Sequence, residues 1–203
     1  KLLEDIYNGF VRNGANLQGE AKEKYRALCK ELSLLTLQFS ENNLKETNDY
    51  KLVITDKSQL AGLPESAVEA AAETAGEKGV EGWVFTLQAP SYGPFLTYAD
   101  SRDLRRELYM AYNTKCTHDN ASNNLEIVKK LANVRMEIAQ LLGYDNFAEY
   151  NLQERMAQNS ESVYKLLDQL LEAYTPTAKQ EYAEVQALAR QAEGEDFVVM
   201  PWD

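Results

Sequence analysis

Histidine and cysteine are scarce in this chain, and their scarcity limits the chemistry that it can perform alone. Its 203 residues include one histidine, His118, and two cysteines, Cys29 and Cys116. A zinc site of the H-E-x-x-H type needs two histidines four residues apart on a helix, so this chain cannot form one. The two cysteines lie far apart and outside any C-x-x-C pair, which favours buried small hydrophobic side chains over a disulfide.

The surroundings of the one histidine do not predict a metal site. Cys116, His118 and Asp119 place three possible ligands within four residues, and ligands so crowded do not easily surround a tetrahedral ion. We therefore expect His118 to be a partly exposed loop residue that binds no metal. No Ser or Cys lies in a G-x-S-x-G elbow, and the Gly76–Gly79 segment lacks the Gly-Lys-Ser/Thr end of a phosphate loop.

Basic residues and long apolar runs are also in short supply. Lys and Arg number 21 against 32 Asp and Glu, which gives a formal net charge of −11. That balance repels a phosphate backbone, so we expect no nucleic-acid partner. No apolar run approaches the roughly 18 residues that span a bilayer, so we expect no membrane partner. Apolar residues make up 44% of the chain, which is typical of a folded globular protein.

Carboxylates are abundant, but no pair of them stands out as an acid and base. Their helical spacing places most of them on outward faces near lysines, and we interpret them as solvated surface residues. A free-standing acid–base enzyme, which needs carboxylates with perturbed pKa values in a cleft, is therefore the least favoured class. The residues concerned are Glu20, Glu23, Glu31, Glu41, Glu181 and Glu184.

The first part of the chain is predicted to form two helices. A short helix runs from Lys1 to Val11, and a long amphipathic helix follows from Gly19 or Glu20 to about Lys45. The long helix is indicated by apolar residues that step alternately by four and three positions, which places them on one face. These residues are Ala21, Tyr25, Leu28, Leu32, Leu35 and Phe39.

Two strands and an intervening helix are predicted next. Residues 51–55 and 82–88 are rich in β-branched and aromatic side chains and are expected to pair in one small sheet. Pro64 suits the first position of a helix that continues to Ala75. Aromatic residues gather at the junction that follows, where core packing is favoured over a peptide-binding groove. They are Trp83, Tyr92, Phe95, Tyr98, Tyr109 and Tyr112.

Capping signals mark the remaining helices. Asp100 or Ser101 is expected to cap a helix that ends near Lys115. A second helix carries an apolar stripe from Ile127 to Leu141, and Gly143 is expected to follow its end as a left-handed residue. Asn146 and Glu149 form the pattern of a capping box, which predicts a further helix. Ser160 is expected to cap the last and longest helix, and that helix is expected to bend or break at Pro176, because proline removes a backbone hydrogen bond.

Three segments, in order, resemble a known family. Residues 101–112 read SRDLRRELYMAY, a helical stretch from Leu125 to Leu142 leads into GYDNFA at 143–148, and QERMA follows at 153–157. Together they resemble the N-terminal half of the thimet oligopeptidase family of zinc metallopeptidases, particularly its bacterial peptidyl-dipeptidase branch. One such phrase is weak, whereas three in register are fairly specific.

The resemblance implies a fold and a role. It implies a mainly α, neurolysin-like N-terminal portion: a multi-helix bundle of residues 1–203 in one helical domain, with a hairpin-like insertion at about 50–88. This portion is expected to form a channel wall in a two-lobed enzyme that hydrolyses short peptides with a zinc-activated water. We expect the chain to be a fragment with no catalytic or metal-binding residues of its own, and the zinc and the remaining catalytic portion to belong to the same longer polypeptide.

One alternative function remains open at this point. A non-catalytic helical module for protein interactions accounts equally well for the amphipathic helices. An H-E-x-x-H motif further along the polypeptide favours the peptidase, and an unrelated continuation favours the module. A cytoplasmic location is expected, with a periplasmic or exported protein left as an alternative.

Overall fold

The computed structural model describes residues 1–203 and contains eight α-helices, one 3-10 helix and one two-stranded antiparallel sheet. The predicted mainly α fold with a small sheet is therefore confirmed. The chain divides into two compact units: unit 1 comprises residues 1–39 and 125–182, and unit 2 comprises residues 40–124 and 183–203. The expectation of one helical domain stays a prediction. None of the helices combines the length and the apolar character that crossing a bilayer requires.

Unit 1 consists of helices and short connections. Its elements are α1 (Leu2–Arg12), the first part of α2 (Gly19–Asp49), α6 (Leu125–Leu141), α7 (Phe147–Leu152) and the first part of α8 (Ser160–Glu193).

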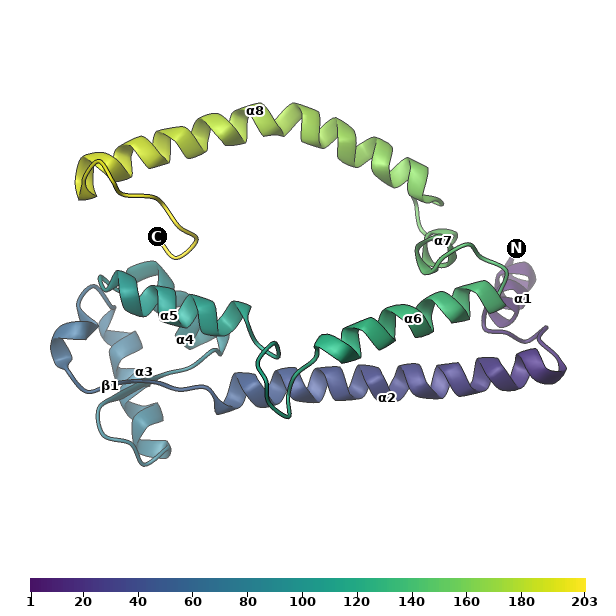
Figure 1. The fold of residues 1–203 in the computed structure, drawn as a ribbon, viewed down its shortest axis with the longest axis horizontal. Coiled ribbons are helices and arrows are strands. Elements are labelled where there is room, and N and C mark those ends of the chain that lie inside the picture. Colours follow the sequence, from purple (N-terminus) through teal and green to yellow (C-terminus); the bar gives the residue numbers. More distant parts are fainter. The chain divides into compact units, whose positions relative to one another are not determined.

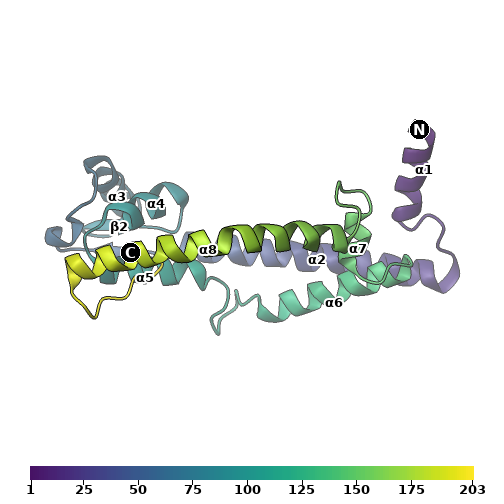
Figure 2. The ribbon, with the colours of Figure 1, turned by 90° about the horizontal axis from the view of Figure 1, so that it is seen from above.

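Helices α2 and α6 form the core of unit 1 through the faces that their spacing predicts. Leu28 on α2 packs with Val134 and Ile138 on α6, and all three are buried. An ion pair of 2.9 Å between Lys24 Nζ and a Glu137 carboxylate oxygen joins the same two helices at the surface. The two ribbons accordingly run side by side in Figures 1 and 2.

The predicted caps in unit 1 are confirmed in part. Gly143 has a φ of 86°, the left-handed value expected after the end of α6. The Asn146 side chain accepts a 3.0 Å hydrogen bond from the Glu149 N–H and caps α7. The Glu149 carboxylate does not complete the box, because it accepts hydrogen bonds from the backbone N–H and hydroxyl of Ser160.

The cap of α8 differs from the prediction, and the helix has no break at Pro176. Asn159, rather than Ser160, caps the helix, since its side chain accepts a 2.8 Å hydrogen bond from the Ser162 N–H. The hydroxyl of Ser160 is committed to Glu149 instead. Pro176 does not break the helix, which is continuous from Ser160 to Glu193. Proline costs one backbone bond, and the turns on both sides maintain the helix.

Unit 2 is built around the small sheet. Its elements are the last turns of α2, β1 (Leu52–Ile54), a 3-10 helix η1 (Lys57–Leu60), α3 (Glu65–Glu77), β2 (Trp83–Phe85), α4 (Ala89–Tyr98), α5 (Arg102–Asn113), the end of α8 and the segment to residue 203. The strands pair antiparallel, with Leu52 opposite Phe85 and Ile54 opposite Trp83. Both strands are shorter than predicted, because only three residues of each make ladder partners.

Two stretches of unit 2 are helical beyond the prediction. Residues 89–98 form α4, although Pro90, Gly93 and Pro94 are typical of turns; Pro90 stands in the first turn, where no N–H is needed, and Phe95 is completely buried. Helix α2 continues to Asp49, beyond the predicted end near Lys45, and the Tyr50 N–H donates to the Glu46 carbonyl oxygen at 3.3 Å, which satisfies one of the free carbonyl groups of the last turn.

The core of unit 2 is larger than that of unit 1. Phe85 and Phe95 meet edge to face with ring centroids 4.6 Å apart, and Ile54 and Leu108 complete its centre. Each of these four side chains is at most 1% exposed. Residues from β1, β2, α4 and α5 are therefore fixed to one another by burial of apolar surface, which is the dominant favourable contribution to folding.

Candidate functional site at the start of helix α5

The segment that carries the family resemblance begins with a capped helix. The Ser101 hydroxyl accepts a 3.4 Å hydrogen bond from the Leu104 N–H, which confirms the predicted cap of α5. Arg102, Arg105 and Arg106 then fall three and four residues apart, so they share one side of the helix. The sequence thus places three guanidinium groups on one surface at the start of α5.

Arg102 binds the carboxylate of Asp203 with two parallel hydrogen bonds. Its Nε lies 2.8 Å from Asp203 Oδ1 and its Nη2 lies 2.7 Å from Oδ2. The same Nη2 donates to the carbonyl oxygen of Val198 at 2.9 Å, and the guanidinium lies over the Phe197 ring at 4.3 Å. Such two-point binding of a carboxylate fixes direction as well as distance.

Arg105 joins the end of α4 to the end of the chain. Its Nη1 donates to the carbonyl oxygen of Ala99 at 2.6 Å, and its Nε donates to that of Trp202 at 2.7 Å. Its side chain is 16% exposed, so these hydrogen bonds are largely shielded from water. We call Arg102, Arg105, Trp202 and Asp203 the α5 junction.

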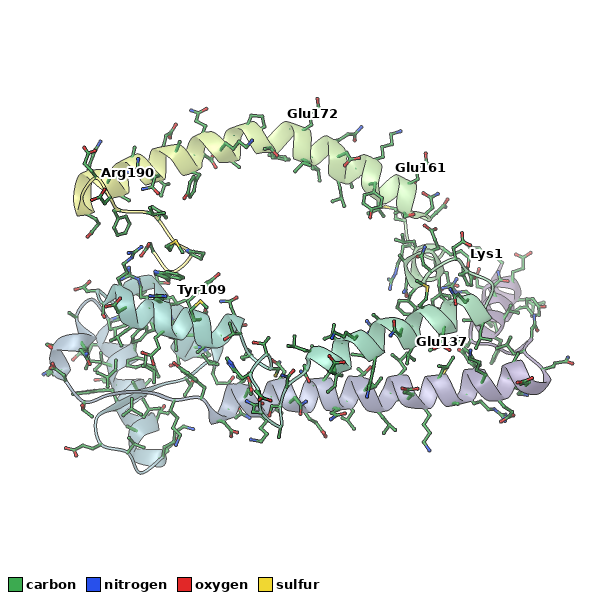
Figure 3. All side chains as sticks on the ribbon, in the orientation of Figure 1. Lys1, Tyr109, Glu137, Glu161, Glu172 and Arg190 are labelled. Atoms are coloured by element: carbon green, nitrogen blue, oxygen red, sulfur yellow. The ribbon has the colours of Figure 1, made fainter.

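Aromatic and backbone contacts complete the α5 junction. Tyr109 on α5 is labelled in Figure 3, and its ring centroid lies 5.8 Å from that of Trp202. The Arg106 guanidinium lies over the Trp202 ring at 5.5 Å. On α8, the Gln186 side chain donates to the carbonyl oxygen of Phe197 and accepts from the Val199 N–H. Segment 197–203 is therefore held by both α5 and α8 within unit 2.

The α5 junction is an electrostatically satisfied structure. The Arg102 guanidinium holds the pKa of the Asp203 carboxyl below its usual value; burial opposes this shift, and a hydrogen bond from the Met200 N–H reinforces it. The side chain of Asp203 is 10% exposed. A carboxylate that is charged, paired and shielded in this way suits the docking of a segment and does not suit proton transfer, which needs a pKa near the working pH.

The predicted aromatic gathering divides between core and surface. Phe95 is in the core, with Trp83 and Tyr92 packed against it, and this confirms the core interpretation for these three. Tyr92 also stacks on Tyr112 at 4.4 Å between ring centroids. Tyr98 is 53% exposed and does not belong to that core.

Residues near the single histidine form a hydrogen-bonded cluster that the sequence did not predict. We call Glu46, Cys116 and Asn120 the Glu46 cluster. Glu46, on α2, accepts hydrogen bonds from the Cys116 N–H and, at 2.8 Å, from the Asn120 side chain. Burial opposes the ionisation of Glu46, but these two hydrogen bonds lower its pKa overall. Cys116 has a φ of 59°, an uncommon value for a residue with a side chain. The partners are 70 or more residues apart, so no local signal announces them.

His118 is exposed, as predicted, and its Nε2 lies 3.4 Å from the Thr114 hydroxyl. Cys116 is buried, and both cysteines are free thiols. No group of three His, Cys, Asp or Glu side chains in the chain could hold a metal ion. The donors of this chain therefore do not fit a zinc ion. The six carboxylates predicted to be solvated are all exposed.

Tyr50 is a second residue that the sequence did not reveal. Its hydroxyl is buried without a hydrogen-bond partner, and burial, with the nearby charge of Glu107, raises its pKa to about 12. It lines a pocket of about 430 Å³ together with Lys115 and His118. A phenol with a raised pKa remains neutral at physiological pH and offers a donor, but nothing here activates it as a base.

Comparison with known proteins gives a consistent result. Residues 95–203 match the model of peptidase family M3. Over all of its length, the chain is 35% identical to oligopeptidase A of Haemophilus influenzae, 34% identical to the probable cytosolic oligopeptidase A of Arabidopsis thaliana and 31% identical to dipeptidyl carboxypeptidase of Escherichia coli. The chain spans 30% of the length of each of these relatives. The whole α5 junction lies inside the range that matches the family model.

Proposed function

The chain belongs to peptidase family M3, and from this we propose that it is one helical portion of a longer metallopeptidase that hydrolyses short peptides. The proposal is carried by the alignment, in which relatives named as peptidases match all of the chain while the chain spans 30% of their length. Both an oligopeptidase and a dipeptidyl carboxypeptidase are among these relatives. The proposal therefore covers peptide hydrolysis without choosing between internal cleavage and release of C-terminal dipeptides.

The zinc ion and the groups that act on the peptide bond are proposed to belong to the remainder of the polypeptide. The chain has one histidine, whereas an H-E-x-x-H site needs two. Its exposed carboxylates and its satisfied α5 junction offer no substitute. We assign no catalytic step to any residue of this chain, and propose that its contribution is a wall that limits which peptides reach the catalytic portion.

The surface that meets the remainder of the polypeptide is proposed to include the apolar faces of α1 and α8. Neither helix has a buried residue, although both are amphipathic. On α1, Leu3 is 80% exposed and Phe10 is 65% exposed; on α8, Leu171 and Tyr174 are each 66% exposed. Amphipathic helices are stabilised mainly by packing of the apolar face, so faces this open are expected to be covered in the whole protein.

The α5 junction is proposed to hold segment 197–203 in one fixed orientation. Two arginines bind the last two residues of the chain through side-chain and backbone atoms. A segment held at several points keeps one orientation, which a channel wall needs if it is to be placed accurately against its other half.

The proposal is tested by measuring peptide hydrolysis with two preparations under the same conditions. The 203-residue chain and the longer polypeptide that contains it are each assayed with a quenched fluorescent peptide of about ten residues and with metal analysis. We expect neither cleavage nor stoichiometric zinc for the 203-residue chain, and cleavage that a chelator abolishes for the longer polypeptide. Chelator-sensitive cleavage by the 203-residue chain alone would falsify this assignment.

A non-catalytic interaction module is the second candidate, because the open faces of α1 and α8 also suit a partner protein. It is supported if the longer polypeptide neither contains an H-E-x-x-H motif nor cleaves peptides.

A cytoplasmic location is part of the peptidase proposal. One relative is named as probably cytosolic, and a further one, 34% identical, is named as organellar, chloroplastic or mitochondrial.

A further inference from the structure

A pocket of unit 2 lies outside every feature discussed so far. It encloses about 440 Å³ between α3, β2, the start of α4 and the last turn of α2. That volume is within the range of ligand sites for small molecules. Its lining consists of Thr47, Asn48, Ala67, Ala70, Ala71, Thr74, Lys78, Phe85, Thr86, Gln88, Pro90 and Ser91.

The floor of this pocket is apolar and belongs to the rigid core. Ala71 is 3% exposed and Phe85 is 1% exposed, and both are members of the main core cluster of unit 2. Ala67 and Ala70 extend the same surface along α3. The alanine side chains leave space where larger residues would fill the hollow, so a small aliphatic group can be buried there.

The rim is polar, and most of its groups are already paired. The Ser91 hydroxyl accepts from the Thr86 N–H at 3.0 Å, and the Gln88 side-chain amide donates to Asn48 Oδ1 at 2.8 Å. The Thr74 hydroxyl donates to the Ala70 carbonyl oxygen at 2.8 Å. The exception is Lys78, whose ammonium group makes no hydrogen bond or ion pair.

The charge of the lining differs from that of the whole chain. The chain carries 32 acidic residues and a net charge of −11, yet no acidic residue lines this pocket and Lys78 is its one cation. A local positive charge beside an apolar floor favours a ligand with a carboxylate at the end of an aliphatic group.

We propose that this pocket binds a small aliphatic carboxylate, with the aliphatic group on the alanine floor and the carboxylate at Lys78. Two sources share this chemistry, the C-terminal residue of a short peptide and a free aliphatic acid. The proposal does not depend on the peptidase assignment, because it concerns binding to this chain alone.

Nuclear magnetic resonance titration of the 203-residue chain tests the proposal with three probes. N-acetyl-leucine mimics a peptide end, hexanoate is a free acid, and N-acetyl-leucinamide lacks the charge. We expect both acids to shift the methyl resonances of Ala67, Ala70 and Ala71 saturably. The amide is expected to bind about fivefold more weakly, as befits one exposed charge pair. Tighter binding of N-acetyl-leucine than of hexanoate identifies a peptide end as the source, and the reverse order identifies a free acid.

Two pairs of variants separate charge from space. Lys78→Met is expected to make N-acetyl-leucine bind as weakly as its amide, whereas Lys57→Met, which alters a lysine outside the pocket, leaves the fivefold difference intact. Ala70→Leu fills the floor and is expected to abolish binding of all three probes, whereas Ala72→Leu, on the same helix outside the lining, does not. The proposal is overturned if no acid gives saturable shifts, if acid and amide bind the native chain equally, or if Lys78→Met leaves the difference unchanged.

Discussion

Helices α5 and α8 are both amphipathic, but they are in opposite situations. Leu108 on α5 is completely buried, while no residue of α8 is buried and Leu171 is 66% exposed. The apolar spacing of each sequence predicts a helix and indicates which side is apolar. The contrast shows that such spacing does not identify what covers the apolar side, which for α5 is the core of unit 2 and for α8 is proposed to be the remainder of the polypeptide.

The largest expected effect tests this contrast with the same substitution on both helices. Leu108→Ala should lower the free energy of unfolding by about 2–5 kcal/mol, because it leaves a cavity in the core. Leu171→Ala should change it by at most about 0.5 kcal/mol, because its side chain is already in water. Urea denaturation of the 203-residue chain measures both values. A cost for Leu171→Ala as large as that for Leu108→Ala would show that the face of α8 is covered in solution.

The next effect concerns the α5 junction, which holds segment 197–203. Asp203→Asn removes the charge that Arg102 and Arg105 bind, and should weaken docking of the segment by about 1–2 kcal/mol, since hydrogen bonds to charged groups contribute at about this level. Fluorescence of Trp202, measured in a Trp83→Phe background, reports the docking. Asp196→Asn, which alters an exposed carboxylate of the same region, should leave the signal as it is.

The same pairing makes the junction sensitive to acid. The docked Asp203 has a pKa below its ordinary value of 3.8, because Arg102 favours the charged form. The stabilisation is therefore complete above pH 3.8 and is lost as the pH falls through the lower pKa of the docked state. The Trp202 signal should change in that acidic range in the native chain. An equal change in Asp203→Asn would assign the transition to another group.

Helices and caps were predictable because their signals are local. The stripe of α6, the cap at Ser101 and the left-handed residue Gly143 each depend on neighbours within a few positions. Helix α4 was missed because Gly93 and Pro94 are typical of turns, and only the burial of Phe95 in the core overrides that local preference. Asn159 and Ser160 are adjacent polar residues, and both are residue types that cap helices. In the structure Ser160 donates its hydroxyl to Glu149, so Asn159 caps α8 instead.

The α5 junction and the Glu46 cluster could not be predicted, because the residues that bind one another in them are remote in the sequence. Arg102 was part of the family resemblance, but nothing local links it to Asp203, 101 residues away. Glu46 directly follows the predicted end of the long helix, and its partners lie 70 and 74 residues later in the sequence. Long-range polar pairs of this kind depend on the fold and leave no periodic pattern.

A smaller effect is expected where α2 meets the loop that follows α5. Glu46→Gln loses one of the two hydrogen bonds that fix the loop at Cys116 and Asn120, and should cost about 1.5 kcal/mol. Hydrogen exchange at the Cys116 amide, which donates to Glu46, should accelerate by about tenfold. Glu41→Gln, on an exposed face of the same helix, should leave that exchange rate unchanged. Equal acceleration in both variants would mean that the stability of α2, and not the Glu46 cluster, determines the exchange rate of the Cys116 amide.

The smallest effect tests whether α8 depends on its own local signals when its apolar side is open. Asn159→Ala removes the side chain that accepts from the Ser162 N–H and should cost about 0.5–1 kcal/mol, seen as loss of helix near Tyr164 in amide exchange. Ser162→Ala keeps the backbone donor and should have a smaller effect. A helix with no buried residue has little tertiary packing to compensate for a lost cap, so fraying should extend further than at α5, where Ser101→Ala leaves Leu108 packed. Equal fraying of the two helices would show that α8 is supported along its length by contacts other than its cap.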